Sequence, residues 1–116
     1  MNQININELL NKALALHHQG KLDDADKIYQ LVINSDENNF QANHLHGCIL
    51  SQQLHFDEAI NFLEKAILIE PNNYEANNNL GIAYKNIKNF INSEKYFKNA
   101  ISIDANNYKA FFNCAN

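Results

Sequence analysis

One position of a repeating pattern carries residues that could each bind a polypeptide backbone. Asn11, Leu45, Asn79 and Asn113 follow one another at intervals of 34 residues, and three of the four are asparagine. A carboxamide donates and accepts hydrogen bonds at once, so it can pair with any peptide unit whatever its side chain. A row of such groups would hold an extended polypeptide, although Leu45 interrupts it. Because asparagine is abundant here, a row produced by composition alone is the alternative.

Five histidines and two cysteines could in principle bind a metal or act in catalysis. His17 and His18 are adjacent, so they cannot share one helix face. His46 occupies a position of core type, where we expect a partly buried, hydrogen-bonded histidine. Cys48 and Cys114 form neither a disulfide framework nor a metal motif. No nucleophile with its base, paired carboxylate or phosphate loop is recognisable, so we expect no metal, no cofactor and no enzyme activity.

The 34-residue interval belongs to a longer repeat. The stretch Asn-Asn-Phe-Gln-Ala at 38–42 returns in similar form at 72–76 and 106–110. A fixed period of this size is the signature of a stacked helical repeat. Apolar residues recur at helical spacing in two runs per repeat, separated by breaks such as Gly20. The sequence therefore predicts an all-α fold of helix pairs spanning about 8–35, 41–69 and 75–103, with a seventh short helix near the end.

Two local features of these helices follow from residue type. Asp23 is expected to cap the second helix of the first segment, whereas Ile91 stands at the same position of the third, which predicts a weak helix start. Gly47 and Gly81 are expected where the two helices of a pair cross closely. Gly81→Leu should therefore cost about 1–3 kcal/mol, and Gly81→Ala should be mild or stabilising because alanine is the better helix former.

The repeats resemble the tetratricopeptide repeat (TPR), whose first helix carries Trp-x2-Leu-Gly-x2-Tyr and whose second carries Ala-x3-Phe and a proline. The third segment fits best, with Leu80, Gly81 and Tyr84 in its first helix and Phe97 in its second. The second segment keeps Gly47 and a proline, and the first is degenerate. The resemblance implies a right-handed α-solenoid of antiparallel helix pairs in one TPR domain, with repeats at about 6–39, 40–73 and 74–107 and a partial repeat at 108–116.

In stacked TPR pairs the first helices line a concave groove. By helix face, the groove candidates are Asn7, Leu10, Asn11, Leu14, His17, His18, Gln41, His44, Leu45, Cys48, Ser51, Gln52, Glu75, Asn78, Asn79, Ile82, Lys85, Asn86, Lys109, Phe112, Asn113 and Asn116. The residues that we select as the peptide-binding set are Asn11, His44, Leu45, Asn78, Asn79, Ile82, Lys85 and Asn113.

The asparagine row is similar to the ladder in the TPR superhelix of O-linked N-acetylglucosamine transferase, which holds extended peptides. The repeats are most similar to those of bacterial proteins of that type. Another TPR device is a clamp of Lys, Arg and Asn side chains for the carboxylate tails of chaperones. That clamp is absent here, because its positions carry Leu10, Leu14, Leu45, Glu75 and Asn79. We therefore do not expect binding of chaperone tails.

The resemblance implies a protein–protein interaction scaffold that binds a peptide or protein segment in the groove. The alternative is the N-terminal TPR region of a larger enzyme, such as a glycosyltransferase or sulfotransferase, with its catalytic domain outside this chain. A further expectation is self-association through the C-terminal end, because Phe111, Phe112 and Cys114 would lie on a short terminal helix. Terminal repeats normally need a polar outer face.

Composition limits the partners and the compartment. The formal net charge is −4 without a clustered basic face, so we expect no nucleic-acid partner. No apolar stretch reaches the roughly 20 residues of a membrane span, and residues 1–10 lack the features of a signal peptide. We therefore expect a cytoplasmic protein that does not act at a membrane.

Overall fold

The computed structural model of the 116-residue chain describes residues 5–106. Every regular element in this part is an α-helix. The helices are α1 (Ile6–His18), α2 (Leu22–Ser35), α3 (Phe40–Gln52), α4 (Phe56–Ile69), α5 (Tyr74–Asn86) and α6 (Phe90–Ile103). The pairs match the predicted spans to within two residues at each end, and the all-α prediction is confirmed. The predicted seventh helix, and with it the C-terminal surface expected to self-associate, lies outside the described residues.

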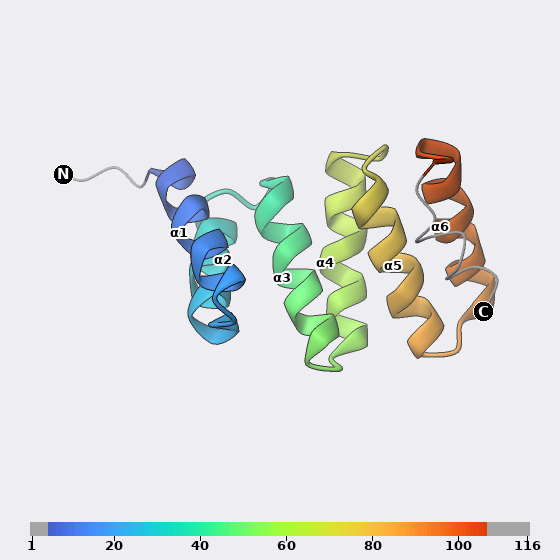
Figure 1. The fold of residues 1–116 in the computed structure, drawn as a ribbon, viewed down its shortest axis with the longest axis horizontal. Helices are drawn as coiled ribbons and strands as arrows, with labels where there is room; N and C mark the ends of the chain where they lie inside the picture. The colour runs from blue at the N-terminus through green and yellow to red at the C-terminus, as the bar shows by residue number, and fades with distance from the viewer. Residues whose placement is uncertain (1–4, 107–116) are drawn as a thin grey trace.

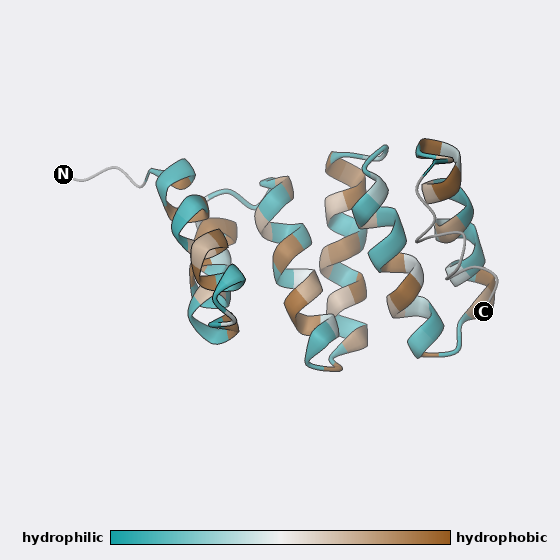
Figure 2. Ribbon diagram, in the orientation of Figure 1, coloured by the Kyte–Doolittle hydropathy of each residue, from teal (hydrophilic) through white to brown (hydrophobic). Residues whose placement is uncertain are grey.

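The helices stand side by side in an elongated body with principal extents of 51 × 25 × 23 Å, as Figure 1 shows. Each helix packs against its neighbours in sequence, and α3 also contacts α5. Brown apolar segments alternate with teal polar ones along every helix, as amphipathic helices require (Figure 2). The architecture is therefore a helical-repeat solenoid. None of the helices described here has the length and apolar character needed to cross a membrane.

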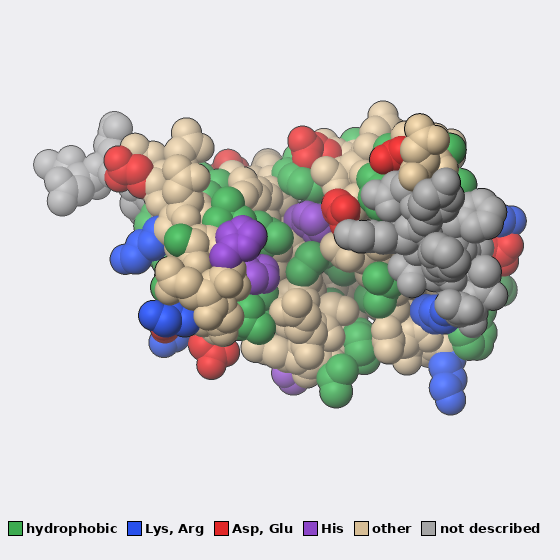
Figure 3. All heavy atoms as spheres, viewed as in Figure 1, with side chains coloured by type: hydrophobic (Ala, Val, Ile, Leu, Met, Phe, Trp, Pro, Cys, Tyr) green, Lys and Arg blue, Asp and Glu red, His purple; other side chains and the backbone are tan. Residues whose placement is uncertain are grey.

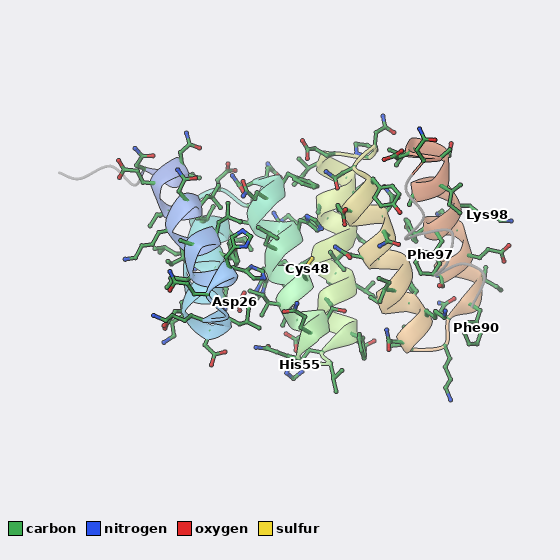
Figure 4. All side chains as sticks on the ribbon, viewed as in Figure 1. Asp26, Cys48, His55, Phe90, Phe97 and Lys98 are labelled. Atoms are coloured by element: carbon green, nitrogen blue, oxygen red, sulfur yellow. The ribbon has the colours of Figure 1, made fainter. Side chains whose placement is uncertain are left out.

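The core divides into three clusters that follow the repeat. The first joins α1, α2 and α3 around the fully buried Tyr29, and the second joins α3, α4 and α5 around Leu63 and Leu80. The third lies at α6 around Phe97, which Figure 4 places between α5 and α6. Stability in such an array is approximately a sum over repeats and the interfaces between them.

An asparagine caps the first helix of each of the three described helix pairs. The side chains of Asn5, Asn39 and Asn73 each accept a hydrogen bond from the backbone N–H three residues on, at 3.2, 2.9 and 2.9 Å. Such a cap satisfies a donor that the helix itself leaves unpaired. The amides of Asn43 and Asn77 then donate to the carbonyls of these same capping residues, both at 2.8 Å. The repeated stretch at 38–42 and 72–76 therefore serves to start a helix.

The second helices begin differently from the sequence-based expectation. The N-cap of α2 is Lys21, which makes no side-chain capping bond, and Asp23 lies in the first turn. The expected Asp23 cap is therefore wrong, although a carboxylate in the first turn still favours the helix through its dipole. The weak start expected at Ile91 is also wrong, because Asn89 caps α6 by accepting from the backbone N–H of Asn92.

Each first helix ends in the same left-handed turn. Gly20, Leu54 and Lys88 have φ angles of 79°, 67° and 65°, and they stand at the same position of their repeats. In each turn the next residue donates its N–H to a carbonyl five residues back, at 2.8–2.9 Å. This is the Schellman arrangement, in which glycine is the usual left-handed residue. Leu54 and Lys88 therefore hold a conformation that costs side-chain-bearing residues energy.

The two helical glycines lie at close crossings, as predicted. A Cβ atom on Gly47 would lie 2.9 Å from Cγ of Leu63, and one on Gly81 would lie 2.5 Å from the ring of Phe97. The hydroxyl of Ser93 reinforces the second crossing by donating to the carbonyl of Gly81 at 2.9 Å. The expectation that Gly81→Ala is mild is therefore overturned, because even one methyl group meets a buried aromatic ring.

We predict that Gly81→Ala destabilises the fold by about 1–3 kcal/mol as an overpacking change, a loss that exceeds the gain of about 1 kcal/mol in helix propensity. Gly47→Ala should cost less than Gly81→Ala, because its Cβ would lie 2.9 Å from Cγ of Leu63, which can shift more easily than the ring of Phe97. Thermal unfolding of both variants beside the wild type measures the difference. Equal melting temperatures for the two variants would contradict the close crossing at Phe97.

A buried polar pair links the first repeat to the second. Nδ1 of His46 lies 2.5 Å from Oδ1 of Asp26, and Gln30 donates to the other carboxylate oxygen at 2.9 Å. The expected hydrogen-bonded histidine is confirmed, because His46 is 7% exposed. One repeat later the same two positions carry Ile60 and Leu80, which belong to one apolar cluster. Equivalent interfaces are therefore polar in one case and apolar in the other.

We predict that Asp26→Ile or His46→Leu alone costs about 1–3 kcal/mol, because each deprives the other residue of this largely buried hydrogen bond. The double variant copies the apolar pair of the next interface and should restore or exceed wild-type stability, since a hydrophobic replacement of a buried polar pair is often neutral or stabilising. Urea unfolding of all four proteins gives the coupling energy. Additive losses in the double variant would show that the pair does not act as a unit.

Candidate functional site

A hollow among the described residues lies between the first helices of the second and third repeats. This pocket has a volume of about 480 Å³, a size typical of ligand sites. Figure 3 shows mainly tan and green atoms over α3 and α5 in the lower part of this face. The residues that line the pocket are Cys48, Ser51, Gln52, Leu54, Phe56, Asn79, Ile82 and Asn86.

The amide of Asn79 ties the two walls of this pocket together. Its Nδ2 atom lies 3.0 Å from Nε2 of His44 and donates to Sγ of Cys48 at 3.2 Å, so α5 is bonded to α3 at two points one helical turn apart. An amide nitrogen only donates hydrogen bonds, so Nε2 of His44 accepts and the imidazole is neutral. His44 also packs against the ring of Phe40, with centroids 5.4 Å apart.

The ionisable groups at this junction are held in their neutral forms. Burial lowers the pKa of His44 from 6.5 to about 4. Burial raises the pKa of the Cys48 thiol to about 12, although the bond from Asn79 acts in the opposite direction. Desolvation penalises the charged state in both cases. The pocket lining therefore carries no residue that is charged at neutral pH.

These residue types occur together in some cysteine hydrolases, but the electrostatics here are opposite. A catalytic cysteine needs a thiolate, which a neighbouring imidazolium or another positive group normally stabilises. Here the pKa of Cys48 is raised and that of His44 is lowered, so neither member of an ion pair forms near pH 7. The cluster can donate and accept hydrogen bonds and offer apolar surface, which suits binding better than bond cleavage.

The structure distributes the selected peptide-binding residues unevenly. Asn79 and Ile82 line the pocket, and His44 supports it through Asn79. Asn11 is exposed on α1 and Lys85 is partly exposed on α5. Leu45 packs against the first core cluster. Asn78 is only 3% exposed and so offers little surface to a groove, and Asn113 lies outside the described residues.

Two lining residues were not among the groove candidates. Leu54 and Phe56 follow α3, in the turn and at the start of α4, and reach the pocket from its end. A search restricted to the faces of the first helices cannot find them. The sequence does mark Leu54 in one way, because the equivalent position of the first repeat is Gly20.

Comparison with known proteins gives a consistent result. A profile described as tetratricopeptide repeat matches residues 9–39 and 40–73, and a second profile of the same description matches residues 62–95. Together the two ranges of the first profile cover more than half of the chain. No curated protein matches the chain.

Solved TPR structures share the fold at low sequence identity. The first TPR of Spaghetti (RPAP3), bound to the HSP90 peptide SRMEEVD, has a TM-score of 0.89 at 18% identity, covering 95% of this chain and 87% of that one. The Arabidopsis OM64 TPR domain also gives 0.89 at 18%, covering 95% and 91%. The second TPR domain of human RPAP3, in complex with the HSP70 peptide SGPTIEEVD, gives 0.86 at 16%, covering 96% of each chain.

His44 gives the site a pH dependence that can be measured. Its pKa is lowered in the fold, so the unfolded chain binds the proton more tightly and stability falls as pH drops from 6.5 towards 4. Between pH 7.5 and pH 5 we predict a loss of about 2 kcal/mol from this group. The measurement is urea unfolding of the wild type and His44→Gln at both pH values.

In His44→Gln, the change in the free energy of unfolding between the two pH values should be smaller by about 2 kcal/mol. His55→Gln replaces an exposed histidine and is the matched control, which should keep the wild-type difference. Identical pH dependence in His44→Gln and the wild type would contradict the burial of a neutral imidazole.

Proposed function

Because the chain belongs to the tetratricopeptide repeat family, we propose that it is a protein-interaction scaffold that binds an extended peptide or protein segment along its first helices. The observation that carries this proposal is the pocket between α3 and α5, which presents side-chain amides beside apolar residues. Amides can pair with the backbone of any peptide, and apolar residues can take up side chains. We place the bound segment across α3 and α5 and propose that it extends towards Asn11 on α1.

The solved relatives support a peptide as the kind of partner. Two TPR domains of RPAP3 are seen with bound peptides, from HSP90 and from HSP70. These complexes concern those proteins, and their sequence identity to this chain is 18% and 16%. The clamp positions of this chain carry other residue types, so the bound sequence is expected to differ. None of these matches supports the alternative in which the chain is part of a larger enzyme.

We assign to Asn79 the contact with the peptide backbone. Both hydrogen bonds of its side chain to α3 use Nδ2, which fixes the amide in one orientation. The carbonyl oxygen Oδ1 is then the atom that accepts from a peptide N–H. Orientation by the neutral His44 means that little side-chain freedom is lost when the peptide binds, which favours affinity. This pre-organisation distinguishes Asn79 from an asparagine that merely reflects composition.

The test starts from a random peptide library displayed on phage and selected against the whole chain. For a selected peptide, Asn79→Ala should weaken binding about fivefold, the value of one hydrogen bond of about 1 kcal/mol. Asn79→Leu should do the same, and it copies Leu45, the residue at this position of the preceding repeat. Fluorescence anisotropy with a labelled peptide gives the dissociation constants, and circular dichroism verifies that each variant is folded.

Asn61→Ala and Asn99→Ala serve as matched controls, because both residues are exposed on second helices. Their affinities should equal that of the wild type. Failure to enrich any peptide would count against the scaffold function itself. Equal affinity in the Asn79 variants and the controls would instead remove Asn79 from the site.

A further inference from the structure

The end of the pocket is formed by a residue in an unfavourable backbone conformation. Leu54 has a φ of 67°, and its side chain is 74% exposed while it lines the pocket. Gly20 makes the same turn in the first repeat, so the fold itself does not need a leucine there. An exposed leucine contributes little to the stability of the free protein. Lys88 holds the same angle one repeat later, so what sets Leu54 apart is its exposed apolar side chain at the pocket.

The chemistry of the lining defines what could fill this pocket. Leu54, Phe56 and Ile82 supply apolar surface, and amides stand around them. A charged side chain brought into this space would lose its hydration without meeting an opposite charge, which is costly. An aliphatic side chain would instead transfer from water to an apolar surface, which is favourable. The pocket therefore discriminates by charge in favour of neutral, apolar groups.

This inference rests on the proposed function. We propose that the pocket between α3 and α5 is a specificity pocket, which receives one uncharged aliphatic side chain of the bound segment. Leu54 packs against this side chain. The peptides seen with the RPAP3 domains end in Glu-Glu-Val-Asp. Acidic groups of that kind have no positive partner in this pocket lining. The partner is therefore a segment with a leucine, isoleucine, valine or methionine flanked by backbone free to bond with Asn79.

The position of Leu54 allows a test with a matched control in the same chain. Leu54→Gly and Lys88→Gly both place glycine at the left-handed position of a turn, so both should raise the melting temperature by about 2–4 °C. Only Leu54→Gly removes a residue of the pocket lining. We expect it to weaken binding of a phage-selected peptide about fivefold or more, whereas Lys88→Gly should leave the affinity unchanged.

The peptide supplies the second arm of the experiment. Each aliphatic residue of the selected peptide is replaced in turn by alanine, aspartate and lysine. At one position alanine should weaken binding, and both charged residues should abolish it. That position should lose its sensitivity in Leu54→Gly, because the two side chains act as a pair.

The outcomes separate this inference from the proposed function. Peptides that depend on Asn79 but bind Leu54→Gly as tightly as the wild type would leave the scaffold function standing and overturn the pocket assignment. Selected peptides with a conserved charged residue at the sensitive position would overturn it as well. Failure of the chain to bind any peptide would contradict both the scaffold function and the specificity pocket. A Leu54→Gly variant that melts below the wild type, while Lys88→Gly melts above it, would show that Leu54 serves the fold instead.

Discussion

The structure depends on the close approach of the two helices within each pair. At Gly81 the approach leaves no room for a methyl group, because an added Cβ would lie 2.5 Å from the ring of Phe97. The first helix is thus pressed onto a large residue of the second, and the position of one fixes the other. Gly47 makes the equivalent contact with Leu63, and this contact sets the spacing between α3 and α4. The pocket between α3 and α5 is lined by residues of both helices together with Leu54 and Phe56, which follow α3.

The repeat-to-repeat contacts are more varied than the contacts within a pair. The interface between the first two repeats uses Asp26 and His46, whereas the next uses Ile60 and Leu80. A directional hydrogen bond constrains register, while an apolar contact mainly supplies burial. The interface between the first two repeats is therefore the more directional one, and the interface between the next two is the more apolar one at these positions. A polar bond of the same kind, from Asn79 to His44, crosses the second interface beside the pocket.

Much of the fold was predictable because its determinants are local and periodic. Apolar spacing located all six described helices, and the small residues at Gly47 and Gly81 located the crossings. The helix starts were less predictable, because capping depends on backbone geometry just outside the helix. Asn89 caps α6 where the sequence indicated a defect, and Asp23 lies inside a helix that it was expected to begin. Residue type alone does not place a cap within two residues.

The site was predictable only in the part that lies on helix faces. Asn79 and Ile82 follow from periodicity, but the burial of Asn78 depends on how tightly neighbouring pairs stack. Leu54 was missed because its importance comes from a backbone angle, and a sequence shows that angle only through the glycine of another repeat. Where one repeat has glycine and another has an exposed leucine at a left-handed position, the fold is satisfied by glycine. Lys88 holds the same angle without lining the pocket, so the feature that distinguishes Leu54 is its exposed apolar side chain there.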